Sequence, residues 1–268
     1  MGSKSLNLRT NRPFRGGAMY MTNRDRLKFE NKYKQPWTPA DIVTSAWFDA
    51  SDTSPTNIIQ SGGLVSQLTD KGTSGTRHLV QSTSGNRMST GLETINGLNV
   101  LSSSVLDKFM QNSGFPIPAS GNVCMSIVAQ IDGQATNTNA SFISMDAENN
   151  DWQLNSDNAS QFNGALNTIG TGSVIGTSDS LTGGPFTGLV VWTIEFNFDD
   201  NVKKVYTNGV ERSSGTYNNK LAPSQLLRIF TNRAGIQSVF GLFGEMVIFE
   251  DISQCANVQT YLTDKWMP

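Results

Sequence analysis

One cluster of acidic residues has an aromatic neighbour: Asp146, Glu148 and Asp151 directly precede Trp152. Glycoside hydrolysis needs two carboxyl groups, one to protonate the leaving oxygen and one to act as base or nucleophile. The spacing of these three acids is typical of a solvated loop. We therefore expect no catalysis here. A polysaccharide hydrolase is a less favoured alternative, and it would depend on Glu148.

His78 is the single histidine of the chain. A zinc site built on several imidazoles and a Ser-His-Asp triad therefore have little to draw on. Residues 76–80 have the pattern of a half-buried strand, which favours a structural or surface role for His78. The sequence also contains no nucleophile elbow and no phosphate loop. These features predict a protein that is not an enzyme.

Four aspartates are candidate calcium ligands, because turns supply carboxylates and backbone carbonyls that calcium binds. They are Asp70, Asp146, Asp199 and Asp200. None of them lies in a ligand-spaced motif, and aspartate is an ordinary turn residue. We expect no metal and no cofactor, with calcium as the alternative.

The aromatic residues divide into two groups. Trp47 and Trp192 lie in apolar, strand-like runs and are expected in the core, whereas Trp152 and Tyr217 can stack on a sugar ring if they are exposed. The candidate glycan-binding residues are Asp146, Asp151, Trp152 and Tyr217.

The two cysteines, Cys124 and Cys255, lie far apart and show neither metal nor redox spacing. This arrangement predicts buried, small apolar side chains and no disulfide framework. The N-terminus has no apolar signal segment, and no stretch approaches the roughly 18 apolar residues of a membrane span. We expect a chain made in a cytoplasm, without a membrane partner.

The composition favours short strands over long helices. Of the 268 residues, 37% are hydrophobic and only 16% are charged, and there are 25 glycines. Long helices would need more alanine, leucine, glutamate and lysine, whereas glycine, serine, threonine and asparagine suit turns. The fold class is therefore expected to be all-β, with one sandwich domain at residues 37–268.

Several segments predict particular elements. Apolar residues alternate along 189–198 and 123–131, so one face of each strand is expected in the core and the other in water. Asn208-Gly209 predicts a two-residue hairpin turn, since a type I′ turn requires two positive φ angles. Residues 243–249 predict a late strand, and a short helix is expected from Ser253, its candidate N-cap.

Residues 1–36 predict an extended, basic N-terminal arm. Nine lysines and arginines against two acids give it a charge of +7, while the remainder carries −9. Apolar residues are interspersed with the cations, which favours docking onto another protein over binding to nucleic acid. The candidate docking residues are Arg9, Arg12, Phe14, Arg15, Tyr20, Arg24, Arg26 and Phe29.

Three stretches together resemble one known superfamily. They are 37–71, which includes Ala46-Trp47-Phe48-Asp49, the hairpin at 205–210, and the strand and helix at 243–266. In this combination the chain is similar to concanavalin A-like, laminin-G-like jelly-roll domains, a form common in bacterial surface proteins and tailed-phage virion proteins. The resemblance implies a jelly-roll β-sandwich. The Glu-x-Asp-x-x-Glu strand motif of the glucanase branch is missing.

The resemblance and the arm together imply a virion structural protein made in the host cytoplasm. The arm is expected to anchor it to other virion proteins, the major capsid protein first, in a homo-oligomer or multicopy assembly. The jelly roll would then be displayed as a capsid decoration, cement or adhesion module. The alternative is a lectin-like module that recognises carbohydrate on the host surface.

Overall fold

The computed structural model describes most of the chain after the arm. The described residues are 36–116, 121–134, 141–146, 151–155, 165–169, 188–197, 199–200, 202–216, 224–231 and 238–268. They belong to one compact unit, Trp37–Pro268. The arm lies outside the described residues, so its docking residues remain a prediction.

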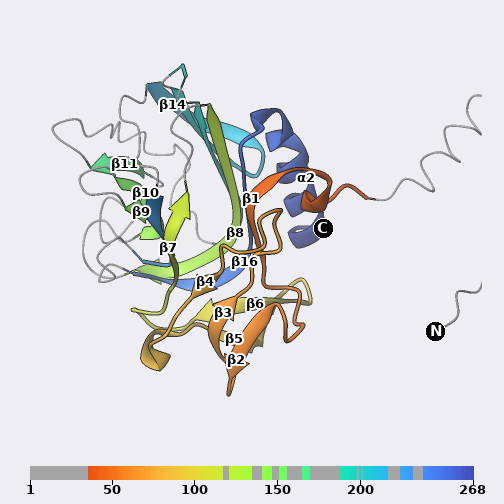
Figure 1. The fold of residues 1–268 in the computed structure, drawn as a ribbon, viewed down its shortest axis with the longest axis vertical. Coiled ribbons are helices and arrows are strands. Elements are labelled where there is room, and N and C mark those ends of the chain that lie inside the picture. The colour runs from red at the N-terminus through yellow and green to blue at the C-terminus, as the bar shows by residue number, and fades with distance from the viewer. Residues whose placement is uncertain are drawn as a thin grey trace, which may run out of the picture. The chain divides into compact units, whose positions relative to one another are not determined.

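The described strands form two facing layers, and every pair of neighbouring strands is antiparallel. In Figure 1 the long, curved layer carries the labels β8, β14 and β16, and the layer with β7, β9, β10 and β11 faces it. The curved layer contains β1 (Thr44–Asp49), β8 (Asn122–Gln134), β12 (Gly188–Asn197), β13 (Val202–Thr207), β14 (Val210–Thr216) and β16 (Val239–Phe249). The facing layer contains β7 (Met110–Pro116), β9 (Ser141–Asp146), β10 (Asp151–Asn155), β11 (Ala165–Ile169) and β15 (Ser224–Ile229).

A third group of strands connects the two layers at one end of the sandwich, at the bottom of Figure 1. The hydrogen-bonded path runs from β7 through β4, β3, β5 and β6 to β16, and β2 pairs with the edge of β3. The members are β2 (Ile58–Ser61), β3 (Leu64–Leu68), β4 (Leu79–Val80), β5 (Ser89–Ile95) and β6 (Leu98–Ser103). This architecture confirms the predicted all-β sandwich.

Alternation along the strands builds the core between the layers. Val190, Trp192, Ile194 and Phe196 of β12 are all buried there, as the period of two predicts. Trp192 lies 5.7 Å from the ring of Phe142 in β9, across the sandwich. Burial of such aromatic side chains supplies much of the apolar area that stabilises the two layers.

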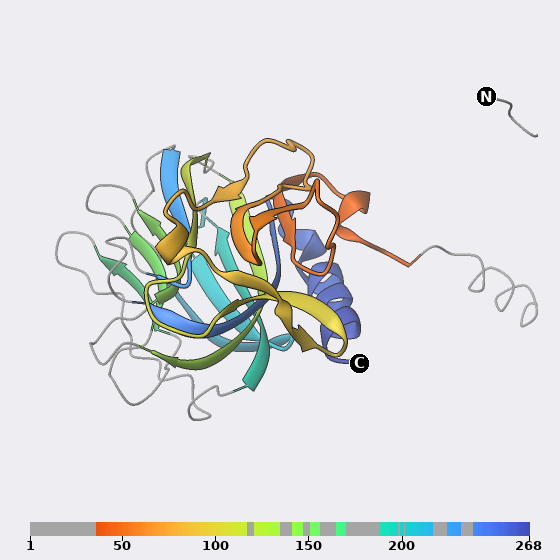
Figure 2. The same ribbon diagram turned by 90° about the horizontal axis from the view of Figure 1, so that it is seen from below.

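The prediction that the other face of this strand lies in water is wrong for Val191 and Thr193, although Glu195 and Asn197 are partly exposed. Val191 and Thr193 are fully buried, because the C-terminal helix α2 (Cys255–Trp266) packs against β8 and β12. Val191 contacts a second apolar cluster that includes Val258 and Leu262 of the helix. Figures 1 and 2 show α2 on the side of the curved layer that faces away from β9 and β10.

The two cysteines are buried as predicted, but the expectation of separate thiols is wrong. Cys124 of β8 and Cys255, the first residue of α2, form a disulfide across 131 positions of sequence. The sequence spacing gave no signal for this pair, because β8 and α2 meet only through the folded sheet. The disulfide joins the helix covalently to the curved layer.

Two hairpins follow the turn chemistry of asparagine and glycine. Asn208 and Gly209 have φ angles of 50° and 76° and join β13 to β14, which confirms the predicted type I′ turn. Asn96 and Gly97 have the same signs of φ and join β5 to β6. The second hairpin forms part of the site described below.

The short helices differ from the prediction at one point. Ser253 does not cap α2; instead, the Asp251 carboxylate accepts a hydrogen bond from the Ser253 N–H at the start of the 3-10 turn η3 (Ile252–Gln254). Two further 3-10 turns are η1 (Pro39–Asp41) and η2 (Ser84–Asn86). Among the described residues, no helix combines the length and apolarity required to cross a membrane.

Candidate functional site

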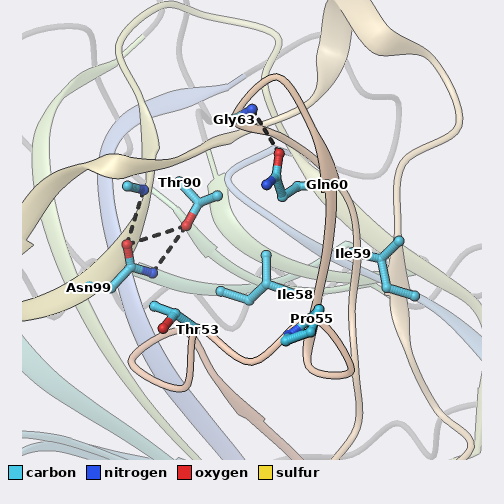
Figure 3. Close-up of a pocket in the computed structure, with 9 residues that line it drawn as sticks. Thr53, Pro55, Ile58, Ile59, Gln60, Gly63, Thr90 and Asn99 are labelled. Atoms are coloured by element: carbon cyan, nitrogen blue, oxygen red, sulfur yellow. Dashed lines mark hydrogen bonds between the residues drawn. The ribbon is translucent and has the colours of Figure 1, made fainter.

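An open pocket of about 370 Å³ lies at the end of the sandwich where β2, β3, β5 and β6 meet. Figure 3 shows its lining, which comes from the loop before β2, the β2–β3 hairpin and the β5–β6 hairpin. The lining residues are Thr53, Pro55, Ile58, Ile59, Gln60, Gly63, Thr90, Gly91 and Asn99. The volume lies at the lower end of the range of small-molecule sites.

Asn99 organises one wall of the pocket (Figure 3). Its side-chain Oδ1 accepts a hydrogen bond from the Gly91 N–H at 3.0 Å, and its Nδ2 donates to the Thr90 hydroxyl at 3.0 Å. The same Nδ2 donates to the Ala50 carbonyl at 2.6 Å. The amide of Asn99 therefore fixes two hairpin residues and one loop against each other.

The backbone of β5 explains why Asn99 can reach these partners. The pairing of β5 with β6 loses register between Thr90 and Thr94, and Gly91 has a φ of 78°. Glycine adopts this left-handed conformation without the steric cost that a side chain adds. The resulting irregularity places the Gly91 N–H at Asn99 instead of in the strand ladder.

Two other lining residues, Gln60 and Thr53, carry hydrogen-bonding capacity that the described residues leave unused. Gln60 Oε1 accepts a hydrogen bond from the Gly63 N–H at 2.8 Å, and this contact holds the side chain in place. No described residue accepts from Gln60 Nε2, and the Thr53 hydroxyl has no hydrogen bond within the described part of the chain. Both groups line the pocket and are accessible to a ligand.

Aliphatic side chains form the rest of the lining. Ile58 is buried in the core, whereas Ile59 is 44% exposed, and Pro55 lies next to Ile58 in Figure 3. Every residue that lines the pocket is uncharged. The pocket therefore offers apolar contact and neutral hydrogen bonds but no ion pair.

A second, acidic cavity of about 480 Å³ lies near the start of the described chain. Its lining residues are Asp41, Ile42, Val43, Ser45, Glu250, Asp251 and Gln254. The hydrogen bond from the Ser253 hydroxyl lowers the pKa of Asp251. The acids are exposed, and nothing in the described structure directs them toward a ligand.

Two buried carboxylates initially suggest an active site, but their contacts are structural. Glu245 of β16 accepts hydrogen bonds from the indole N–H groups of Trp47 and Trp266 at 2.7 and 2.8 Å. It also accepts from the Tyr261 hydroxyl at 3.1 Å and pairs with Lys265 at 2.6 Å. Four donors occupy the carboxylate, which is fully buried and lines neither of the two cavities described above.

The second carboxylate, Asp49, lies beside the first and shares a cation with it. Lys265 Nζ is 3.0 Å from Asp49, and Lys71 Nζ contacts both Asp49 and Asp52 at 3.1 Å. Burial and the charge of Asp49 raise the pKa of Glu245, while Lys265 opposes this increase. The network fastens α2 to β1 and β16, and we assign it no catalytic role.

The predicted glycan-binding residues are only partly described. Asp146 ends β9 and Asp151 begins β10, with Trp152 paired to Met145 in the antiparallel register. Their side chains and the whole of Tyr217 lie outside what the structure describes, as does Glu148. These four candidate residues remain a prediction.

His78 and the calcium candidate Asp70 contact each other in the loop between β3 and β4. His78 Nδ1 accepts a hydrogen bond from the Asp70 N–H at 3.1 Å, consistent with a structural histidine. The Asp70 carboxylate accepts from the backbone N–H groups of Trp47, Gly72 and Arg77, and from a serine hydroxyl. It closes the open edge of β1 and has no free face for calcium.

The remaining calcium candidates are also ordinary turn residues where they are described. Asp199 accepts a hydrogen bond from the Gly121 N–H, and Asp200 accepts from the Asn197 side chain. Within the described ranges, no group of three or more histidine, cysteine or acidic side chains is arranged to hold a metal ion.

Sequence reasoning missed the residues of the uncharged pocket. Thr53, Gln60, Thr90 and Asn99 lie in four separate segments, and strand pairing alone brings them together. The Asn96-Gly97 turn was the available signal, because it predicts the hairpin in which Asn99 pairs with Thr94 and its side chain reaches Thr90. No spacing rule connects that hairpin to the loop at residue 53.

The geometry defines the class of the protein: an all-β, jelly-roll-like sandwich closed by a C-terminal helix. No protein-family model matches the sequence, and no curated protein matches it. Among solved structures, the chain is similar to domain 4 of AbnA, a GH43 extracellular arabinanase from Geobacillus stearothermophilus, solved in complex with arabinotriose. The TM-score is 0.51 at 16% identity, over 81% of this chain and 98% of that domain.

Two further solved structures show weaker similarity. A GH54 α-L-arabinofuranosidase gives a TM-score of 0.49 at 13% identity, over 86% of this chain and 66% of that one. The binding domain of botulinum neurotoxin serotype D gives 0.46 at 14% identity, over 82% of this chain and 51% of that one. At these identities the similarity concerns the fold alone.

Proposed function

We propose that this protein is a carbohydrate-binding β-sandwich module that binds without turnover. The observation that carries the proposal is the open pocket lined by uncharged hydrogen-bonding groups and aliphatic side chains. Sugars require this mixture, because each ring carries hydroxyl groups at its rim and apolar C–H groups on its faces. The arabinanase domain, which has a similar fold over nearly its full length and was solved with arabinotriose, supports the same proposal.

A glycan array tests the proposal on the full chain, residues 1–268. We expect selective binding to one class of oligosaccharide, with a Kd on the order of 1 μM to 1 mM by titration calorimetry. Absence of binding to every printed glycan at high protein concentration would contradict it.

The absence of turnover is a separate part of the proposal. Asp49 and Glu245, two buried acids of the described residues, are fully engaged by lysines, indoles and hydroxyls. We expect no new reducing ends when bound oligosaccharides are incubated with the chain. Release of reducing ends that disappears in Glu148→Gln would instead establish a hydrolase.

A second candidate function is that of a virion structural protein. The observation that favours it is the separation of charge, with +7 on residues 1–36 and −9 on the rest, together with apolar residues among the cations. Such an arm can anchor many copies to a particle, most directly to its major capsid protein, and multivalency strengthens the attachment. The two functions are compatible, since an anchored sandwich can display a glycan site.

Truncation tests the second candidate. Residues 37–268 form a compact unit, so a chain that begins at Trp37 is expected to fold. If the arm is the anchor, the truncated chain should no longer co-sediment with particles that bind the full chain. Equal co-sedimentation of both chains would exclude anchoring by the arm.

A further inference from the structure

We infer that the pocket between the β2–β3 and β5–β6 hairpins binds one neutral sugar ring, with Thr53, Gln60 and Thr90 as its direct hydrogen-bonding contacts. This inference rests on the proposed function and assigns to it a site and a ligand class. It concerns the pocket of Figure 3, whose lining includes none of the predicted glycan-binding residues.

The charge of the lining selects the ligand class. All nine lining residues are uncharged, so the pocket contains no lysine or arginine to pair with a sugar carboxylate. Removing a carboxylate from water without a partner is strongly unfavourable. The pocket is therefore suited to neutral hexoses and pentoses and disfavours sialic and uronic acids.

The unused polar groups match what a sugar hydroxyl needs. Gln60 Nε2 offers two N–H donors, because Gln60 Oε1 is already held by the Gly63 N–H. The Thr53 hydroxyl both donates and accepts, and the Thr90 hydroxyl keeps one lone pair beyond its contact with Asn99 Nδ2. Sugar hydroxyls also donate and accept, so each of these groups can contact one.

The aliphatic lining suits the remaining surface of the ring. Ile59 is 44% exposed on the edge strand β2, and Pro55 and Ile58 lie next to each other in Figure 3. Covering exposed aliphatic surface with the C–H groups of a ring removes apolar area from water. The pocket thus combines a partly exposed apolar side with hydrogen-bonding groups on two walls.

Asn99 is a positioning residue for this pocket. Its amide is shared among Thr90, Gly91 and the Ala50 carbonyl, so its capacity is used within the protein. It fixes the orientation of the Thr90 hydroxyl before a ligand arrives. Fixing a contact in advance lowers the entropic cost of binding.

Two near-isosteric variants test the direct contacts. Gln60→Glu keeps the oxygen that the Gly63 N–H contacts but replaces the two N–H donors with an acceptor, and Thr53→Val removes only the hydroxyl. Each is expected to weaken binding about 3- to 10-fold, the effect of losing one or two neutral hydrogen bonds. Both residues are exposed, so the sandwich should remain folded, as circular dichroism would verify.

Gln254→Glu supplies a matched control. Gln254 also uses its Oε1 as acceptor, from Asn257 Nδ2 at 2.8 Å, but it lines the acidic cavity. The chemical change is the same, and only the place differs. This variant is expected to bind sugar as well as the unmodified chain.

The probes are the methyl glycosides of arabinose, galactose, glucose and mannose, with sialic acid and glucuronic acid as the charged set. Saturation-transfer NMR on the full chain should detect binding of at least one neutral glycoside. The signal should be weaker with Gln60→Glu and Thr53→Val, but unchanged with Gln254→Glu. Neutral binding that both pocket variants leave unchanged would overturn the site while leaving the proposed function intact. Preference for the acids would overturn the ligand class, and no binding here or on the array would overturn both proposals.

Discussion

Asp49 links three parts of the chain through its charge. It ends β1, and its carboxylate contacts Lys71 from the loop between β3 and β4 and Lys265 from α2. Burial alone would raise the pKa of Asp49, but Lys265, Ser51 and Lys71 outweigh burial and hold it below 3.8. Burial alone would lower the pKa of Lys71, but the carboxylates of Asp49 and Asp52 outweigh burial and raise it above 10.5.

These directions predict a pH window for the contact between Asp49 and Lys71. A lowered carboxyl pKa stabilises the fold above 3.8 and loses that effect as the pH falls through the native pKa. A raised lysine pKa stabilises the fold below 10.5 and loses that effect as the pH rises through the native pKa. The contact is therefore fully effective between these two values.

Replacing Lys71 with methionine should lower the free energy of unfolding by about 1–2 kcal/mol at pH 7, since the pair is only partly exposed. The loss should shrink as the pH falls from 3.8 through the native pKa of Asp49, because a protonated carboxyl no longer attracts Lys71. Urea titrations followed by tryptophan fluorescence at pH 7 and pH 3 measure both values. Lys204→Met, which breaks an exposed 3.9 Å pair with Glu211, should change stability by less than about 0.5 kcal/mol at either pH.

The residues of the pocket show why the sequence alone did not predict this site. The sequence favoured structural roles for His78 and Asp70, because His78 is the single histidine and Asp70 lies in no ligand-spaced motif. Thr53, Gln60 and Asn99 carry no chemical signature, since their value comes from which hydrogen bonds the fold leaves unused. That property depends on the β2–β3 and β5–β6 registers and cannot be derived from spacing.

Among the described glycines, Gly241 of β16 has the least space for a side chain. Gly241 has a φ of 149°, at a register shift against β8, and a Cβ there would lie 2.0 Å from the Gln130 carbonyl oxygen. No side chain fits without moving one of the two central strands. This glycine therefore sets how β8 and β16 curve past each other.

Gly241→Ala is expected to destabilise the fold by about 3 kcal/mol or more, because it adds an overpacking cost to the cost of the backbone conformation. Gly97→Ala is the matched control, with a φ of 78° and no atom within 4 Å of the added Cβ. It should cost about 1–2 kcal/mol from the conformation alone. Thermal unfolding of the two variants compares these effects, and equal losses would show that the close approach is not a constraint.

Sequence periodicity predicted where strands and turns lie better than it predicted which of their faces are buried. The alternation at 189–198 located β12, and Asn208-Gly209 located the turn between β13 and β14, because both signals are local. The burial of Val191 and Thr193 depends on α2, more than fifty residues later, so alternation alone predicted water there. The apolar character of Cys124, Val128 and Val191 on the supposed outer face was the overlooked signal.

For the molecule as a whole, the disulfide between Cys124 and Cys255 closes a large loop. Restricting the unfolded chain in this way stabilises the native state by up to about 5 kcal/mol in the chain-entropy account for a loop of 131 residues. We expect Cys255→Ser to lower the free energy of unfolding by about 2–5 kcal/mol. Urea titration measures the loss, and the double variant with Cys124→Ser should match the single one.

A reductant distinguishes the bond from the packing of the sulfur atoms. Adding dithiothreitol should bring the unmodified chain close to the stability of Cys255→Ser, and it should leave that variant unchanged. A loss in the variant without any effect of reductant would assign the stability to packing around Cys255, which is buried against β8 and the helix.

The same disulfide determines how the protein carries mechanical load. When the two ends are pulled, tension passes from β8 directly into α2, and the 131-residue segment from β8 to β16 stays slack. About 450 Å of contour length is thereby withheld from extension until the bond is reduced. A sandwich tethered by its N-terminal arm would keep strands β9 to β16 shielded from this tension while its surface is being pulled.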